Sequence, residues 1–412
     1  MPSMLEISEK IIFIYKMSRS ILYDLIVDKR GITGQQVPLL LQTSKDIYDS
    51  FEKVKANQNY EDSSMAHSAT QQTVHTWKYQ TGIRGEWWLE LQTDGVGTAV
   101  YPNWWGYNAI QILELIVGQS LIKCTGKQLQ NYARFYNVHK GDVSRQQLKN
   151  LVDAGTGSFA TPTSVFIPLL LPGQNCVLGE LSQPINLALL NAPFQIQITL
   201  APGNQISTTT AVTLSRVRLH WREYQMEPDQ AKLFNKFSMV DLNNYQAIMS
   251  QTITQNSNLV LSQIQGVFDT SGKKECIGFF VDVVSTTTES TNLDPFNTQQ
   301  IENLTFSIGN QNVYQHYNLQ MAKFLSLQMM PGTATNWYGQ DTMPIYFIPF
   351  KSQSLEDSYE VKGTPGVNLS RVQSSLTLNS SSATTGTYNI YLSSMNKATF
   401  NIHQDGTATF DP

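Results

Sequence analysis

Hydrophobic and polar residues alternate along most of this chain, and such alternation predicts strands that bury one face. The alternation is clearest at residues 87–92, 110–115 and 194–200. Between the first two of these strands lie the turn-forming pairs Asp94-Gly95 and Pro102-Asn103. Further strands are predicted at residues 164–171, 212–219, 276–284, 345–350, 374–378, 388–392 and 398–402. The chain is therefore predicted to be mainly β.

Helical spacing of hydrophobic residues interrupts this pattern in a few places. It predicts an amphipathic helix at residues 4–28, a second helical piece at 39–54, and further helices at 128–137, 143–153 and 314–329. Asp142 is a candidate cap for the helix at 143–153, and Gly155 follows its end. The polar segment 55–70 is interpreted as a linker.

One short pattern occurs twice in the chain, in the same order. The first copy is Ile116-Val117-Gly118-Gln119, Phe166-Ile167-Pro168 and Ile185-Asn186-Leu187. The second copy is Ser307-Ile308-Gly309-Asn310, Phe347-Ile348-Pro349 and Val367-Asn368-Leu369, displaced by 191, 181 and 182 positions. This repetition predicts two similar β domains in tandem. The repetition favours a structural subunit over an enzyme, because duplicating a domain duplicates its contact surfaces more readily than it creates a catalytic site.

The pattern predicts an all-β fold of two tandem jelly-roll β-sandwiches with helical loop insertions, preceded by N-terminal helices. Jelly rolls close a double sheet with long crossing loops, and such loops tolerate insertions. The predicted division is an N-terminal helical arm at residues 1–64, a first jelly roll at 65–228, a connector at 229–240 and a second jelly roll at 241–412.

Composition adds that the chain carries few charges. Charged residues make up 15% of its 412 residues, against roughly 25% in an average protein. Uncharged polar surfaces suit a chain that neighbours will cover, since burying a charge costs more than burying a paired amide. A net charge of −4 argues against a protein that coats nucleic acid. Three widely spaced cysteines predict neither a disulfide framework nor a paired-cysteine metal site.

No catalytic, cofactor-binding or metal-binding residues are predicted. His220 and Glu223 would point to opposite faces of a strand, so they do not form a metal pair, and no His-x-His sequence occurs. The loop at residues 155–158 lacks the strand-to-helix context of a hydrolase nucleophile.

The pairs Trp87-Trp88 and Trp104-Trp105 allow two hypotheses. Exposed tryptophans stack on sugars in carbohydrate-binding sandwiches. Alternatively, one residue of each pair enters the core while the other meets a neighbouring chain, since tryptophan is enriched at interfaces.

Several segments resemble the double jelly-roll major capsid proteins of tailless, lipid-containing bacteriophages of the tectivirus type and of large eukaryotic DNA viruses. The resemblance covers roughly residues 65–408, in patches, and the C-terminal patches are the strongest. These patches are residues 366–378 and 387–396, then 165–171, 184–200 and 241–245, with the predicted helix at 128–137 in the place of a loop helix of that family. The Gly-rich ending found in the large DNA viruses is absent.

The resemblance implies a structural capsid protein of the virion, not an enzyme, that assembles in the host cytoplasm. It would form homotrimers with a pseudo-hexagonal outline that tile an icosahedral shell, over an internal membrane. Its partners would be itself, neighbouring capsomers, and penton and minor capsid proteins, without direct contact to nucleic acid. The helix at residues 4–28 packs on protein or touches the membrane.

Two other functions stay open at this stage. One is a carbohydrate-binding tandem β-sandwich, such as a viral spike or a surface lectin, which the tryptophan pairs motivate. The other is a minor or penton-type capsid protein, although those usually carry a single jelly roll.

Overall fold

The computed structural model describes the two β regions of the chain. The described residues are 55–138, 142–155, 157–174, 183–225, 236–242, 245–253, 258–262, 275–286, 301–308, 311–316, 346–349, 374–380 and 386–411. The predicted helices at residues 4–28 and 39–54 lie outside this part.

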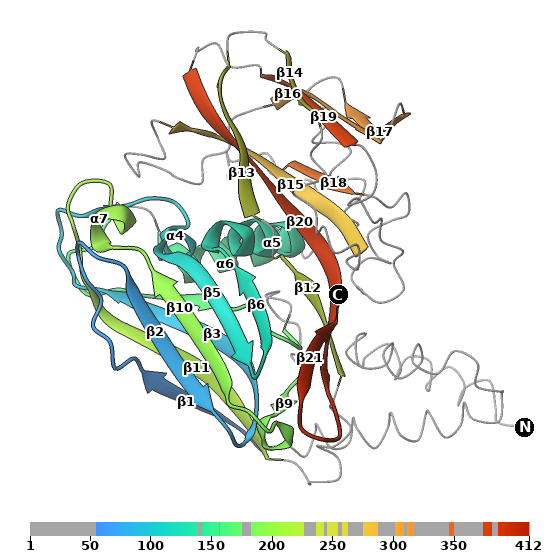
Figure 1. Cartoon of the computed structure of the whole chain (residues 1–412). Helices are drawn as coiled ribbons and strands as arrows, with labels where there is room; N and C mark the ends of the chain where they lie inside the picture. The colour runs from blue at the N-terminus through green and yellow to red at the C-terminus, as the bar shows by residue number, and fades with distance from the viewer. Residues whose placement is uncertain are drawn as a thin grey trace, which may run out of the picture.

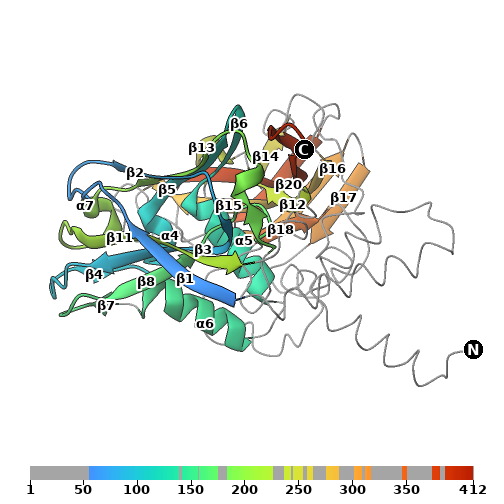
Figure 2. The same ribbon diagram turned by 90° about the horizontal axis from the view of Figure 1, so that it is seen from below.

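The first region is a sandwich of two antiparallel sheets, which Figure 2 shows as two layers. One sheet has the order β1-β11-β3-β8, with the short β9 beside β3, and the other has the order β2-β10-β5-β6. The strands are β1 (Lys55–Asp62), β2 (Thr73–Tyr79), β3 (Ile83–Thr93), β5 (Ile110–Val117), β6 (Ser120–Cys124), β8 (Ser164–Pro168), β9 (Ile185–Asn186), β10 (Phe194–Leu200) and β11 (Leu214–Gln225). A small bridge joins β4 (Val100–Tyr101) to β7 (Gly157–Ser158).

The second region repeats the two four-strand orders of this plan. One sheet has the order β12-β20-β15-β18, with β13 and β21 also on β20, and the other has the order β14-β19-β16-β17. The strands are β12 (Lys236–Asp241), β13 (Tyr245–Ile253), β14 (Asn258–Ser262), β15 (Glu275–Ser285), β16 (Ile301–Ile308), β17 (Gln311–His316), β18 (Tyr346–Pro349), β19 (Ser374–Ser380), β20 (Gly386–Ile402) and β21 (Ala408–Asp411). Both regions are therefore jelly rolls, as the sequence predicted.

The sequence repeats occupy matching places in the two rolls. Gly118 follows β5 at its turn into β6, and Gly309 follows β16 before β17. Pro168 of β8 lies opposite Trp88 of β3, and Pro349 of β18 lies opposite Gly278 of β15.

Helices lie at the end of the first sandwich that meets the second jelly roll (Figure 1). They are α4 (Trp105–Ala109), α5 (Gly126–Val138) and α6 (Asp142–Asp153), while α7 (Gly203–Ile206) and a 3-10 turn (Leu187–Leu189) lie in other loops. The predictions at 128–137 and 143–153 are confirmed by α5 and α6. Asp142 begins α6, and Gly155 follows it with φ 91°.

Aromatic rings fill one end of the first sandwich core. The Trp87 ring lies 5.7 Å from the rings of both Tyr79 and Phe194, and 6.0 Å from that of Trp221. These residues come from four strands of the two sheets, so their alternation places them face to face.

Several sequence interpretations were wrong. Residues 55–62 are strand β1, not part of a linker or helical arm, because backbone pairing with β11 holds an edge strand that has no apolar alternation. Residues 236–240 of the predicted connector belong to β12, which pairs with β20. Residues 314–316, predicted helical, end β17, and the rest of that prediction lies outside the described residues. The domain boundaries themselves stay a prediction.

Candidate functional site: the junction and outer faces of the two jelly rolls

A buried polar cluster joins α5 of the first roll to β15 of the second. Lys127 Nζ lies 3.6 Å from Asp282 Oδ1, and both side chains are almost fully buried. Asn131 Nδ2 donates a hydrogen bond of 2.8 Å to Asp282 Oδ2. The amide of Gln128 also donates to the carbonyl of Leu242. The cluster fixes one helix of the first roll on a sheet of the second, because a buried carboxylate needs these partners.

The position of α5 depends on a glycine at its start. A Cβ added to Gly126 would overlap the carbonyl oxygens of Tyr107 and Ile110. Only glycine lets the first turn of α5 approach this backbone, which then directs Lys127 and Asn131 towards β15.

Strand β15 is buried on both faces. Phe279 packs edge-on against Phe306 of the opposite sheet, with ring centroids 5.1 Å apart. Phe280, on the other face, belongs to a hydrophobic core shared with the first roll. This explains the apolar run at residues 276–284, which a strand with one solvent-facing side would not need.

A hairpin of β20 and β21 makes a second contact between the rolls (Figure 1). Ser120 Oγ donates a hydrogen bond of 2.8 Å to the Ala408 carbonyl, and the backbone N–H of Asn191 donates one of 2.8 Å to the Gly406 carbonyl. Phe400 is fully buried beside Phe237, and both belong to the shared core. Strand β20 is continuous from Gly386 to Ile402, so the predicted break between 392 and 398 does not exist.

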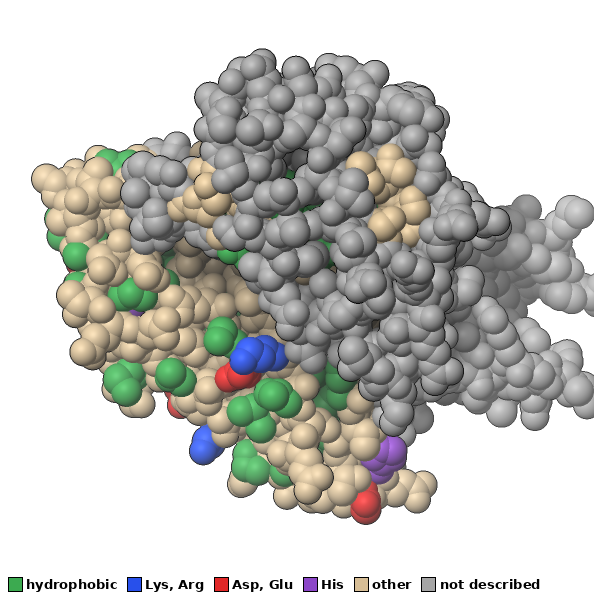
Figure 3. All heavy atoms as spheres, turned by 45° about the horizontal axis from the view of Figure 1, so that its top comes forward, with side chains coloured by type: hydrophobic (Ala, Val, Ile, Leu, Met, Phe, Trp, Pro, Cys, Tyr) green, Lys and Arg blue, Asp and Glu red, His purple; other side chains and the backbone are tan. Residues whose placement is uncertain are grey.

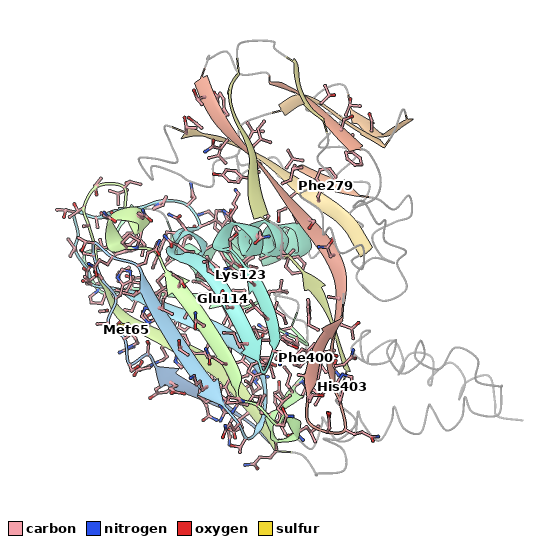
Figure 4. All side chains as sticks on the ribbon, viewed as in Figure 1. Met65, Glu114, Lys123, Phe279, Phe400 and His403 are labelled. Carbon is pink, nitrogen blue, oxygen red and sulfur yellow. The ribbon has the colours of Figure 1, made fainter. Side chains whose placement is uncertain are left out.

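The outer face of the β2-β10-β5-β6 sheet carries few charges, among them the exposed Lys78 of β2. Glu114 and Lys123 form an ion pair of 3.3 Å there, and Gln197 donates 3.0 Å to Glu114 (Figure 4). Exposed Val74 and Leu121 lie on the two edge strands. Figure 3 shows a basic and an acidic side chain in contact on a face where hydrophobic and uncharged side chains predominate. Covering such a face with another chain would cost little desolvation free energy, because few charges would leave water.

The outer face of the β1-β11-β3-β8 sheet carries a charged network around Glu90. His220 Nε2 lies 2.7 Å from one Glu90 oxygen, and Ser164 donates 2.8 Å to the other. Burial alone would raise the pKa of Glu90, but these hydrogen bonds and nearby Arg218 lower it below its ordinary value. Arg218 also pairs at 2.7 Å with Asp62, whose pKa that hydrogen bond lowers. The carboxylates are thus held ionised on this face.

The tryptophan pairs are mostly core residues. Trp87, Trp104 and Trp105 are fully buried, and only Trp88 is half-exposed, on the outer face of β3. The first pair therefore divides between core and surface as one hypothesis expected. The second does not, because Trp104 has φ 60° and directly precedes α4, so this pair does not lie on an alternating strand. Trp105 Nε1 donates 3.0 Å to the Asp153 carbonyl.

The histidines of the first roll are structural. His67 contacts the Ala201 carbonyl at 2.9 Å, and His220 is part of the Glu90 network. Within the described residues, no three side chains of His, Cys, Asp or Glu lie close enough together to hold a metal ion. Gly157 and Ser158 form the short strand β7 and not the strand-to-helix turn of a nucleophile. No described helix is long and apolar enough to cross a membrane.

Acid is expected to destabilise the first roll through His75. Its ring nitrogens lie 2.7 Å from Ser63 Oγ and 2.9 Å from Thr73 Oγ1, and burial lowers its pKa from 6.5 to about 4. The unfolded chain takes up a proton first, so the free energy of unfolding falls as the pH drops from 6.5 towards 4. His75→Asn should flatten this part of the curve in urea titrations, whereas His403→Asn, on the surface, should keep the wild-type slope. Equal slopes for wild type and His75→Asn would contradict the assignment.

The two rolls, joined through one core, define a double jelly-roll protein. No family model matches the chain, and no curated protein matches its sequence. Solved structures do match. VP54 of PBCV-1, fitted into a reconstruction of the virophage Sputnik, has a TM-score of 0.59 at 11% identity and covers 87% of this chain and 97% of its own. A chain of the Sputnik virophage has a TM-score of 0.54 at 10% identity, covering 87% and 88%.

The Faustovirus major capsid protein has a TM-score of 0.53 at 7% identity, covering 85% of this chain and 91% of its own. At such identities the likeness shows the fold. The match runs through both rolls, so the tandem arrangement itself is shared.

Sequence reasoning missed the polar clusters of the junction and of the outer face. Asp282 and Glu90 are single acids within apolar strands, at Gly278–Val284 and Trp87–Leu91. An acid at such a position is a signal for a buried partner. The partners, Lys127 and His220, lie 155 and 130 positions away, so the sequence did not identify them.

Proposed function

We propose that this chain is the major capsid protein of an icosahedral virus, with a structural and not a catalytic role. The observation that carries the proposal is the repetition of one jelly roll within a chain, in an arrangement shared with a major capsid protein over 85% of this chain. A chain with two equivalent bodies offers two equivalent sets of lateral contacts, which suits a closed lattice.

The finer proposal is a homotrimer. Three chains with two rolls each fill a six-sided position in a lattice with threefold symmetry. The sparsely charged face of β2-β10-β5-β6 supports lateral burial against other capsomers, since few charges would need partners there. The proposal is completed by penton and minor capsid proteins as partners, by an internal membrane beneath the segment that precedes β1, and by assembly in the host cytoplasm. No direct contact with nucleic acid is included.

The junction supports a rigid building block. The two rolls are held together at three places, which are the Lys127–Asp282 pair, the β20–β21 hairpin and the shared core. A fixed angle between the rolls is needed if three chains are to close into one regular outline, because each error in angle would be repeated around the ring.

Native mass spectrometry and negative-stain imaging test the proposal directly. We expect the purified full-length chain to have three times the mass of one copy and to show a six-sided outline. The expected self-association follows from the large interface that closed trimers of two-roll chains would form. A chain that remains monomeric over a range of salt and protein concentration, with two separate lobes, would contradict the proposal.

Most of the tryptophans that motivated the carbohydrate-binding hypothesis are buried. Trp104 and Trp105 are fully buried, so neither has a free ring face to stack on a sugar. The described structure leaves Trp88 as the half-exposed member of the two pairs. A glycan array with wild type and Trp88→Ala separates the functions, since saturable binding lost in the variant would favour the lectin.

A further inference from the structure

The contact between the two rolls within one chain has a counterpart on the first roll. Helix α5 lies between β6 and β8 along the chain, and it covers the outer face of the β12-β20-β15-β18 sheet (Figures 1 and 2). Phe280, Asp282 and Ser393 of that face are all buried. The matching sheet of the first roll, β1-β11-β3-β8, has the same strand order. Its outer face is where an equivalent contact would form.

Register makes the correspondence of the two faces specific. Ile167 of β8 pairs with Leu89, and Ile348 of β18 pairs with Phe279, so Leu89 and Phe279 are equivalent. The neighbouring positions Glu90 and Phe280 are then equivalent as well. Phe280 contributes to the core shared with the first roll, whereas Glu90 lies among Arg218, His220 and Ser164.

The first-roll face has properties of an interface at its edge. Tyr60 of β1 is 58% exposed, with the Arg218 guanidinium 3.9 Å from its ring centre. Half-exposed Trp88 and Phe166 lie on the same face. The Nδ1 of His220 is buried with no hydrogen-bond partner among the described residues. Exposed aromatic rings, an arginine and an unsatisfied buried nitrogen together are typical of a surface that another molecule completes.

A short sequence pattern of α5 occurs a second time at the matching place along the chain. Leu129-Gln130 and Ala133-Arg134-Phe135 of α5 correspond to Leu319-Gln320 and Ala322-Lys323-Phe324, displaced by 190 and 189 positions. The second set follows β17 and precedes β18, as α5 follows β6 and precedes β8. Residues 317–345 are also rich in Met, Leu and aromatic residues, with one Lys and one Asp, which suits burial on an aromatic face.

We propose that the outer face of β1-β11-β3-β8 binds the β17-to-β18 segment, residues 317–345, of a second copy of this chain. The contact repeats between copies the one that α5 makes within a copy. It is head-to-tail, so each copy offers one face and one segment, and the arrangement continues until it closes into a ring. This inference rests on the proposed function and names the surface that would build the trimer.

Photo-crosslinking of the full-length chain tests the contact. Benzoylphenylalanine at position 60 is irradiated in an equimolar mixture of ¹⁴N- and ¹⁵N-labelled protein, and the crosslinked peptides are identified by mass. We expect mixed-isotope crosslinks to peptides within residues 317–345. The control places the same residue at Val74, an exposed residue on the opposite sheet of the same roll, and should give no crosslink to that segment.

A charge at the same position provides an independent readout. Tyr60→Glu should weaken self-association by about tenfold or more, because a carboxylate would be buried in the interface, while Val74→Glu should leave the trimer intact. Both side chains are exposed, so both variants should keep the wild-type melting temperature. Crosslinks to residues 1–54 of the same copy, or to any other segment, would overturn the docking proposal alone. A wild-type chain that does not associate at all would overturn the proposed function with it.

Discussion

Asp282→Ala is expected to cost about 3–5 kcal/mol of unfolding free energy and to separate the unfolding of the two rolls. The substitution leaves the Lys127 ammonium buried at the junction without the carboxylate 3.6 Å away. It also removes the acceptor of the Asn131 hydrogen bond. Because this cluster links α5 to β15, the loss falls on the contact between the rolls.

Two spectroscopic probes can detect this separation. Six of the seven tryptophans lie at positions 77–221, so tryptophan fluorescence reports mainly on the first roll, whereas circular dichroism reports on strands of both. The wild-type transitions in urea should coincide, and those of Asp282→Ala should not.

Matched variants control for simple loss of charge. Glu114→Ala breaks an ion pair whose lysine is 44% exposed and should cost about 1 kcal/mol or less. Combining Lys127→Met with Asp282→Leu should recover much of the loss, since an apolar pair of similar volume leaves no unpaired charge. Coincident transitions and a loss below about 1 kcal/mol in Asp282→Ala would show that the cluster does not hold the rolls together.

Trp87→Ala is expected to destabilise the first roll by about 3–5 kcal/mol. The ring is fully buried against Tyr79, Phe194 and Trp221, so its removal leaves a cavity between the two sheets. The measurement is the urea midpoint of the purified variant, or its soluble yield if it does not fold.

The adjacent residue is the matched control. Trp88 lies on the opposite face of β3 and is half-exposed, so Trp88→Ala removes the same side chain without opening the core. It should fold, with a clearly smaller loss of stability than Trp87→Ala. Equal losses in the two variants would contradict the assignment of core and surface faces on β3.

The strand assignments were predictable where burial imposes a period of two. The alternation at residues 194–200 predicted β10, and the turn signals predicted the ends of neighbouring strands. Strand β1 was not predictable in this way, because an edge strand held by backbone hydrogen bonds to β11 has no need of apolar side chains. The continuity of β20 was missed for a related reason, since Ser393, Ser394 and Asn396 are polar yet buried.

Local sequence was sufficient for many of the strands and helices, the duplication and the all-β class, because periodicity, turn residues and short repeats depend on neighbours along the chain. Long-range contacts needed the folded structure. Three contacts join segments far apart in the chain: the pairing of Lys127 with Asp282, the hydrogen bond from Trp105 to the Asp153 carbonyl, and the network around Glu90. The charge and hydropathy of one residue do not identify the distant groups that will bury it. These contacts therefore follow from packing in three dimensions.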